Sequence, residues 1–393
     1  QNEGPTTQVS RQVYEALVTR GLDMQIGPQL ATDWKATSPT TWVFNLRKDV
    51  KFSDGTQMTS EDVVFSILRA KLPTSDFKEY ISSISAVKAI DDYSIQIDTA
   101  EPNPILLNQL SNIFVISKAW ATENFSIAPQ NWNASQETYA SVNAMGTGPF
   151  KITLREPNTK TVFKKNKKWW GEVEHNLTSI ELLPIANAAT RVAALLSGEI
   201  DIVTDAPVQD LGRIGSSAGH KVVSTPQMRT IFLGMDQGAD ELRSGNTGDN
   251  PFKKKEVRQA LYQAIDINAI KKKVMRGLSE PAGIITFPGV TGYTEDLDKR
   301  LAYDPEAAKK LLADAGYPNG FDVELRCPND RYVNDEAICT AVVGMFGKIG
   351  VNVSLNSQTK SKHFKELKNK KGDFYMLGWG VPTLDSHYVF HYL

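Results

Sequence analysis

Apolar residues recur at every second position near the start of the chain, a pattern that predicts a half-buried strand. In the stretch "TTWVFNLRKD" these residues are Trp42, Phe44 and Leu46. Asp54 and Gly55 follow shortly after and predict a turn, because glycine accepts a positive φ at no steric cost. The first pattern is therefore a strand that ends before a tight turn.

The next stretch, "TSEDVVFSIL", predicts a helix with a defined start. Thr59 is followed three residues later by Asp62, which resembles a capping box. Neither feature requires a ligand, so this part of the chain is expected to build a scaffold. The apolar positions expected to be buried on this helix are Val63, Val64, Ile67 and Leu68.

Strands and helices alternate in the rest of the chain. One helix is predicted to end at Gly198, with a short apolar strand at residues 200–203. A later helix has Asp304 as its cap, Pro305 in its first turn and Gly316 at its end. "FDVELRC" and "VNVSL" flank another helix of about fifteen residues, so the class is mixed α/β. Helices that pack on a sheet are indicated by Val257, Leu261, Ile265, Ile270 and Val274.

Length and composition restrict the class of protein. The 393 residues exceed what one hydrophobic core usually organises, so two or three domains are expected. Basic and acidic side chains nearly balance, 44 against 45, so no overall field favours nucleic acid or an anionic membrane. The chain has no apolar run long enough for a transmembrane helix. Its polar start, "QNEGPTTQ", is not a signal peptide, although a processed chain would have lost one.

The two cysteines lie close together. Cys327 and Cys339 are twelve residues apart in "CPNDRYVNDEAIC", with none elsewhere in the chain. The spacing lacks the two-residue separation of zinc and redox motifs. We therefore predict a local disulfide formed in an oxidising compartment, and two buried thiols are the alternative.

Two motifs that suggest catalysis lack the required context. "GSSAG" matches the G-x-S-x-G pattern, with Ser217 as the nominal nucleophile and His220 directly after it. A nucleophile elbow needs a strand before the serine and a helix after it, whereas "VQDLGRI" predicts a helix and "HKVVSTP" predicts a strand. "MGTGPF" lacks the third glycine and the following helix of a dinucleotide loop, and strand-like "KITL" follows it. Neither motif predicts an enzyme.

The histidines give a weak signal for metal. His387 and His391 are spaced to share one helix face, but the glutamate of the zinc protease motif is absent. The other three, His175, His220 and His363, are scattered among lysines and serines and are expected at the surface. We predict neither a cofactor nor a resident metal.

A tryptophan near the end of the chain is a candidate for ligand contact. In "MLGWGVPTLDSHYVFHYL", Trp379 stands between two glycines on what the pattern predicts to be a loop. Such an indole offers a ligand a flat face and one N–H donor. The alternative is a tryptophan buried in the core. Since every catalytic motif fails, binding is favoured over turnover.

Six stretches, taken in order, are similar to the family 5 extracellular solute-binding proteins of bacterial ATP-driven importers. They are "LATDWKATSPTTWVFNLRKDVKFSDGTQMTSEDVVFSI", "MGTGPFKI", "LLSGEIDI", "VRQALYQAID", "YDPEAAKKLLADAGYPNG" and "MLGWG". The resemblance implies a type II periplasmic clamshell of two lobes that closes on its ligand and docks on membrane permease subunits. It also implies a periplasmic, monomeric protein whose partner is a short peptide and not a nucleic acid.

The resemblance further suggests how the lobes divide. We expect a first lobe at residues 1–230, with an extra subdomain inserted at 36–144, and a second lobe at 231–393. The strand in "QMRTIFLGMDQ" would cross between the lobes and serve as a hinge. Family members usually begin with a further strand and run longer, so the chain is expected to be incomplete at both ends.

The resemblance also implies a set of ligand-binding residues. Arg331 is placed like the family arginine that pairs with a ligand carboxylate, and the alternative is a surface arginine. Peptide binders commonly have an aspartate three residues after the tryptophan, where this chain has Pro382, and Asp385 would substitute for it. The complete expected set is Trp379, Arg331, Asp385, Asn329, Tyr332 and Gly378.

Three functions follow from these observations. The first is capture of short peptides or peptide-like solutes for an ABC importer. The second keeps the transport role but changes the ligand to a nickel chelate, an opine or an oligosaccharide. The third, a remote alternative, is a hydrolase that uses Ser217.

Overall fold

Helices and sheets form two units in the computed structural model, which describes residues 3–131, 137–244 and 247–393. The units are Gln1–Pro184 and Ile185–Leu393. The expected lobe boundary between residues 230 and 231 falls inside the second unit, within a strand that is paired along its whole length. The division into lobes therefore stays a prediction.

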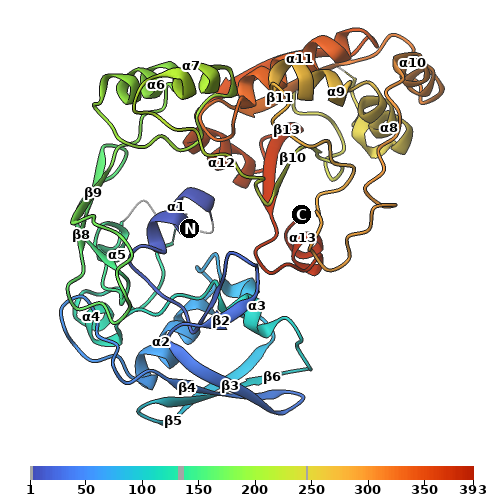
Figure 1. The fold of residues 1–393 in the computed structure, drawn as a ribbon. Helices are drawn as coiled ribbons and strands as arrows, with labels where there is room; N and C mark the ends of the chain where they lie inside the picture. Colours follow the sequence, from blue (N-terminus) through green and yellow to red (C-terminus); the bar gives the residue numbers. More distant parts are fainter. Residues whose placement is uncertain (1–2, 132–136, 245–246) are drawn as a thin grey trace. The chain divides into compact units, whose positions relative to one another are not determined.

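The first unit is built around antiparallel sheets (Figure 1). The largest has the order β3-β4-β6-β5, and helix α2 packs against β5 and β6. A second sheet has the order β7-β8-β9, and β1 pairs with β2. The strands are β1 (Val18–Arg20), β2 (Ile26–Pro28), β3 (Ala31–Ser38), β4 (Thr41–Leu46), β5 (Ile84–Asp91), β6 (Ser94–Thr99), β7 (Phe150–Glu156), β8 (Lys160–Lys165) and β9 (Ser179–Leu182). The helices are α1 (Gly4–Ser10), α2 (Ser60–Ala70), η1 (Lys78–Ile81), α3 (Leu106–Leu110), α4 (Lys118–Glu123) and α5 (Tyr139–Val142).

The capped helix after the first turn forms as predicted, with one correction. Thr59 and Asp62 make both bonds of the capping box at the start of α2. Leu68 is 50% exposed, whereas it was expected to be buried. Part of the buried face of α2 is polar, because Asp62 accepts a bond from the backbone N–H of Lys118 and Ser66 accepts one from that of Ile116. These polar contacts narrow the apolar stripe.

A buried carboxylate ties two distant segments of the first unit together. Glu15 is 3% exposed and accepts the indole N–H groups of Trp169 at 3.1 Å and of Trp170 at 2.9 Å. Nearby, the "MGTGPF" segment passes against the backbone of Val13, where a Cβ on Gly146 would lie 2.0 Å from the carbonyl oxygen. The glycines of this segment thus allow a close approach of two backbones.

The second unit contains one mixed sheet of order β10-β13-β11-β12. β11 runs parallel to both β12 and β13, while β10 runs antiparallel to β13. Helix α11 connects β11 to β12 and packs on both, as the predicted strand-helix-strand unit requires. The strands are β10 (Arg229–Met235), β11 (Asp322–Pro328), β12 (Asn352–Gln358) and β13 (Phe374–Gly380). The helices are α6 (Ala188–Ser197), η2 (Val208–Asp210), α7 (Leu211–Ser216), η3 (Pro251–Lys253), α8 (Lys255–Gln263), α9 (Ile267–Ala269), η4 (Ile270–Val274), α10 (Pro305–Asp314), α11 (Asp335–Gly347), α12 (Lys360–Lys368) and α13 (His387–Tyr392).

Helix ends in the second unit match their predicted signals. Gly198 ends α6 with φ +77°, which favours glycine. Asp304 caps α10 by accepting the backbone N–H of Ala307 at 2.9 Å. Two predicted strands, at residues 200–203 and in "HKVVSTP" after Ser217, are absent: both segments lack strand pairing.

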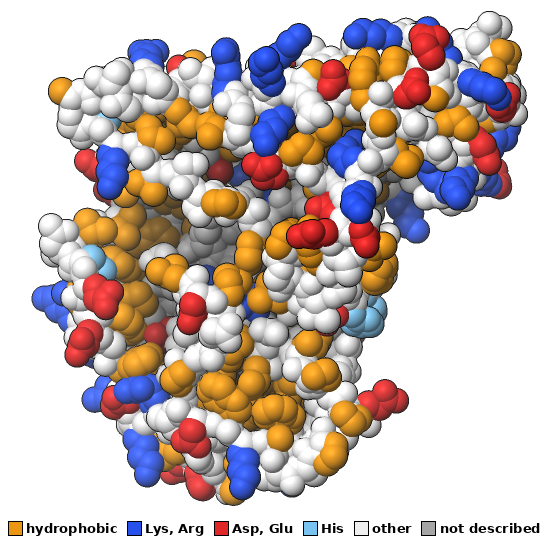
Figure 2. All heavy atoms as spheres, turned by 45° about the vertical axis from the view of Figure 1, so that its right-hand side comes forward, with side chains coloured by type: hydrophobic (Ala, Val, Ile, Leu, Met, Phe, Trp, Pro, Cys, Tyr) orange, Lys and Arg blue, Asp and Glu red, His pale blue; other side chains and the backbone are white. Residues whose placement is uncertain are grey.

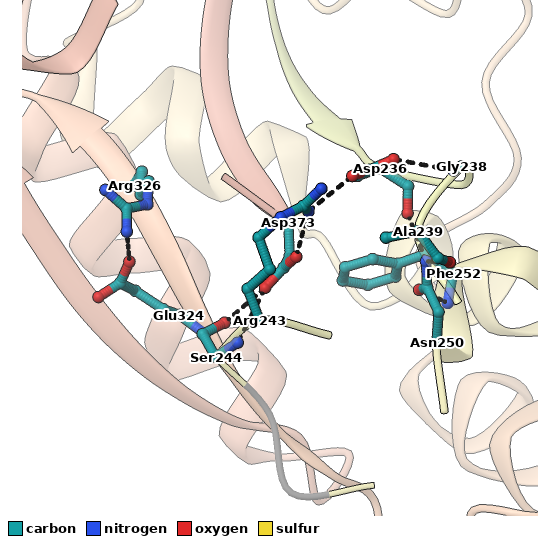
Figure 3. A network of polar contacts seen from close by, with 10 residues as sticks. All are labelled: Asp236, Gly238, Ala239, Arg243, Ser244, Asn250, Phe252, Glu324, Arg326 and Asp373. Atoms are coloured by element: carbon teal, nitrogen blue, oxygen red, sulfur yellow. Dashed lines mark hydrogen bonds and ion pairs between the residues drawn. The ribbon is translucent and has the colours of Figure 1, made fainter. Parts of the chain in front are cut away.

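A polar network anchors the segment that follows β10 to the start of β13 (Figure 3). The Arg243 guanidinium lies between two carboxylates, 2.7 Å from Asp236 and 2.8 Å from Asp373. Asp373 also accepts the backbone N–H and the hydroxyl of Ser244. Because Asp373 is 3% exposed, these donors replace the water it loses on burial.

Charged side chains of both signs are mixed on one face of the molecule (Figure 2). On the face drawn in Figure 2, basic and acidic side chains are interspersed and do not gather by sign. This agrees with the near balance of charges in the sequence. Among the described residues, no helix combines the length and the apolar character needed to span a bilayer.

Candidate functional site

The carboxyl ends of three strands form an edge of the sheet in the second unit. β11, β12 and β13 run in the same direction and end at Pro328, Gln358 and Gly380. In sheets with parallel strands, ligands bind outside the carboxyl ends of the strands. Most of the residues expected to bind ligand lie here. Asn329, Arg331 and Tyr332 follow β11, and Gly378 and Trp379 are among the last three residues of β13.

Side chains fill the gap where β13 separates from β11. The pairing of these strands stops at Arg326 and Tyr375. Beyond that point, Tyr332 accepts the backbone N–H of Gly378 through its hydroxyl at 2.7 Å. A Cβ on Gly378 would lie 2.7 Å from the Tyr332 ring, so glycine is required for this contact. Tyr332 and Gly378 therefore hold the edge in shape.

His363 fills the same gap from α12, which corrects the expectation that it is a surface residue. Its side chain is fully buried, and Nε2 lies 2.9 Å from the carbonyl oxygen of Met376. Nε2 must carry the proton in order to donate to this carbonyl. Burial lowers the pKa of His363. The sequence pattern missed it because the lysines around it lie on the exposed side of the same helix.

The loop after β11 is fixed at its base. The predicted disulfide between Cys327 and Cys339 is present and joins the end of β11 to α11. Inside this ring, Asp335 is 4% exposed and accepts the backbone N–H groups of Arg331 at 3.0 Å and Tyr332 at 2.9 Å. Burial raises the pKa of Asp335, and these bonds oppose that shift. The two residues expected to meet ligand are therefore preorganised.

Two guanidinium groups lie over the Tyr332 ring. Cζ of Arg331 is 4.8 Å from the ring centroid, and Cζ of Arg229 is 5.8 Å from it. Arg229 is the first residue of β10 and stands opposite Gly380 in the register. It was not among the expected residues, because only the antiparallel pairing of β10 with β13 brings it to this edge.

Trp379 lies in β13 and not on a loop, which corrects the prediction. It is half-buried and contacts two rings of α13, with centroids 5.8 Å from Tyr388 and 5.6 Å from Tyr392. Its Nε1 is buried and has no hydrogen-bond partner among the described residues. An indole N–H in this state is suited to a ligand acceptor. Whether the ring contacts ligand stays a prediction.

Asp385 contacts the start of α13, unlike the other residues expected to bind ligand. Its carboxylate accepts the backbone N–H of His387 at 2.9 Å, at the start of α13. Its backbone forms a parallel bridge with Thr291. These contacts hold the start of α13 in place. A role for Asp385 in binding a ligand stays a prediction.

The other candidates from the sequence were Ser217 with His220, and the pair His387 and His391. Ser217 follows α7, and the ring nitrogens of His220 lie 3.0 Å from the carbonyl oxygen of Ala218 and 3.2 Å from that of Leu195. The imidazole is thus directed at backbone. His387 and His391 lie on α13 with ring centroids 5.9 Å apart. The described residues contain no group of three or more His, Cys, Asp or Glu side chains that could hold a metal ion.

Comparison with known proteins gives consistent matches over nearly the whole chain. The model of the family described as "Bacterial extracellular solute-binding proteins, family 5 Middle" matches residues 25–393. The periplasmic murein peptide-binding protein MppA of Escherichia coli (strain K12) is 26% identical over 95% of this chain and 71% of its own length.

Two solved structures extend the comparison to the fold. The periplasmic binding protein AgaA of Agrobacterium tumefaciens R10, in complex with agropinic acid, has a TM-score of 0.77 and 27% identity over 97% of this chain and 74% of its own. The oligopeptide-binding protein AppA of Bacillus subtilis, in complex with a nonapeptide, has a TM-score of 0.84 and 21% identity over 98% of this chain and 76% of its own. The likeness to AppA shows that the chain shares its α/β fold.

Proposed function

The chain belongs to the bacterial extracellular solute-binding proteins of family 5, and we propose that it captures short peptides or peptide-like solutes for an ABC importer. The match over residues 25–393 is the observation that carries this proposal. The relative MppA, by its name, binds murein peptides. We further propose that the protein acts as a periplasmic monomer and delivers its ligand to permease subunits of the importer.

The edge of the second unit supports a binding role. It offers a half-buried indole, two guanidinium groups and a loop closed by a disulfide. A micromolar site needs only about 8 kcal/mol of net binding energy. Ligand contacts would favour one conformer of the protein over others, so binding would shift populations without a catalytic step.

The second candidate is binding of an opine. It rests on the structure of AgaA with agropinic acid, which is 27% identical to this chain. Pro382 stands where an acidic residue was expected for the α-amino group of a peptide. An opine would place less demand on that position, since it carries no terminal α-amino group of a peptide.

The first experiment is to denature the purified protein and to identify the released small molecules by mass spectrometry. Mixed short peptides would support the main proposal, and a single opine would support the second candidate. A fluorophosphonate probe tests the hydrolase alternative in the same sample. No labelling of Ser217 is expected, and labelling would contradict the proposed role.

Substitution of the two central residues tests where the ligand binds. Trp379→Ala and Arg331→Ala should weaken binding in calorimetric titration by about tenfold or more each, because each removes ligand contacts. The melting temperature of the ligand-free protein should change little. A large fall in that temperature for Trp379→Ala would show that the ring serves the core instead.

A further inference from the structure

Two arginine side chains of the first unit reach the same end of one short helix. Arg20 donates from Nη2 to the side-chain oxygen of Asn108 at 3.0 Å, and Arg11 donates from Nη2 to the carbonyl oxygen of Ser111 at 3.5 Å. Asn108 lies in α3, and Ser111 directly follows that helix. Arg20 is the last residue of β1, whereas Arg11 directly follows α1. Separate elements therefore bring the two guanidinium groups together.

The charges of this arginine pair, Arg11 and Arg20, are not neutralised within the described part of the chain. Neither guanidinium forms an ion pair with a carboxylate there. Burial lowers the pKa of Arg20, and the charge of Arg11 lowers it further. Because arginine keeps its proton in proteins, the two groups stay charged and repel each other. An anion at this position would remove that repulsion.

Arg20 also has a hydrogen-bond donor that is not used. Its Nε is buried and lacks a hydrogen-bond partner among the described residues. A guanidinium has five N–H donors, and a buried donor without an acceptor costs free energy. Arg20 is half-buried and Arg11 is exposed, so a small solute can approach the pair from solvent. The arginine pair thus combines positive charge, an unused buried donor and access.

Capping of α3 alone does not explain the arginine pair. Cations are favourable near the carboxyl end of a helix, where backbone carbonyl groups carry a partial negative charge. α3 has only five residues, Leu106–Leu110, and the bond from Arg11 to Ser111 already serves its end. A second cation adds repulsion and leaves its Nε without an acceptor. A bound anion would account for both features.

We infer that Arg11 and Arg20 form a binding site for a small oxyanion, either a carboxylate or a phosphate group, at the carboxyl end of α3. Planar guanidinium groups suit these groups because their N–H donors form parallel hydrogen bonds to two oxygens. The residues proposed to bind the captured solute all lie in the second unit, so this site is additional to them. The oxyanion is either a free ion or a group carried by the solute.

Titration calorimetry with two simple anions tests the site. Inorganic phosphate and succinate are titrated separately into the purified protein, with sodium chloride adjusted to keep the ionic strength constant, because salt screens charges. We expect saturable binding of at least one of the two anions. Arg20→Gln and Arg11→Gln should each weaken this binding about tenfold, since each removes charged donors. Circular dichroism of each variant confirms that it is folded.

Arg155→Gln is the matched control. Arg155 also lies in the first unit and donates from Nε to a backbone carbonyl oxygen, that of Ser141, at 3.0 Å. Its variant should bind both anions as the wild-type protein does. The inference is overturned if the wild-type protein binds neither anion, if Arg11→Gln and Arg20→Gln bind as tightly as wild type, or if Arg155→Gln loses as much affinity as they do.

Asn108→Asp supplies a negative charge from the protein itself. Its carboxylate would replace the side-chain oxygen that accepts from Arg20. In phosphate-free buffer this variant should unfold at a higher urea concentration than wild type, because repulsion is reduced, and its affinity for the two anions should fall about tenfold. Loss of stability in Arg11→Gln and Arg20→Gln with no loss of anion affinity would overturn the inference and assign the arginine pair to the structure of α3.

The same titration on loaded protein identifies the source of the oxyanion. The protein is first saturated with the solute that it releases on denaturation. Unchanged binding of phosphate or succinate would indicate a free ion, whereas loss of that binding would indicate that the solute carries the group, and both results support the site. Failure of the proposed function is distinguishable, since a protein that releases no peptide can still be titrated with both anions.

Discussion

Glu15 and His363 are buried ionisable side chains whose pKa values shift in opposite directions. Burial raises the pKa of Glu15, and the two indole N–H bonds from Trp169 and Trp170 only partly oppose this. Burial lowers the pKa of His363, against the bond to the carbonyl of Met376. In both residues, loss of water disfavours the charged form.

Glu15 should make the protein less stable as the pH rises. Its folded pKa lies above its unfolded value near 4.5, so the native state binds more protons between the two values. Stability from this group is present below pH 4.5 and is lost as the pH rises through the folded pKa. Glu15→Gln does not titrate and should lack this loss. Urea unfolding followed by tryptophan fluorescence across this range measures it, and equal pH slopes for both proteins would contradict it.

His363 should act in the opposite direction. Its folded pKa lies below 6.5, so the unfolded state binds more protons, and stability falls as the pH drops from 6.5 through the folded pKa. His363→Gln can still donate to Met376 and cannot titrate. Chemical unfolding at pH 7.5 and 5.5 should show a smaller loss in the variant. Each unit of pKa difference is worth about 1.4 kcal/mol at full effect.

At the scale of elements, the ends of helices could be predicted from the sequence, but the pairing of strands could not. The capping box of Thr59 and the stop at Gly198 formed as expected, because each depends on residues a few positions apart. The strand predicted at residues 200–203 did not form, since a strand also needs a partner that periodicity does not identify. Arg229 and His363 were missed for the same reason: distant pairing brings Arg229 to the edge, and helix packing buries His363.

The Asp373 network should hold the segment after β10 onto the sheet. Asp373→Ala would remove the acceptor for Arg243 and Ser244 (Figure 3). We expect a loss of about 2 kcal/mol in the free energy of unfolding, less than for a fully buried pair because the Arg243 side chain is 38% exposed. Urea unfolding measures this loss.

Asp240→Ala is the matched control for that experiment. Asp240 pairs with Lys253 at 2.6 Å, but its side chain is 97% exposed. Surface ion pairs contribute little because water and salt screen them. The control should therefore unfold at the wild-type urea concentration. If both variants lose the same stability, burial of Asp373 is not the cause.

At the scale of the whole molecule, a ligand can contact one unit or both. The residues proposed to bind ligand lie in Ile185–Leu393, while the Glu15 contacts lie in Gln1–Pro184. A ligand stabilises the part of the protein that it contacts, by about 2.7 kcal/mol at a concentration one hundred times its Kd. Stabilisation of one unit or of both by ligand therefore reports which units contact it.

Hydrogen exchange measured by mass spectrometry can make this distinction segment by segment. On addition of the ligand released from the purified protein, residues 329–332 and 378–380 should exchange more slowly, because the ligand would cover these backbone groups and oppose local opening. Any segment of Gln1–Pro184 that becomes protected would identify contacts from the first unit. The Arg331→Ala variant is the control and should show weaker protection at equal ligand concentration. Protection elsewhere, with none at residues 329–332 or 378–380, would show that the ligand binds away from the edge of the sheet formed by β11, β12 and β13.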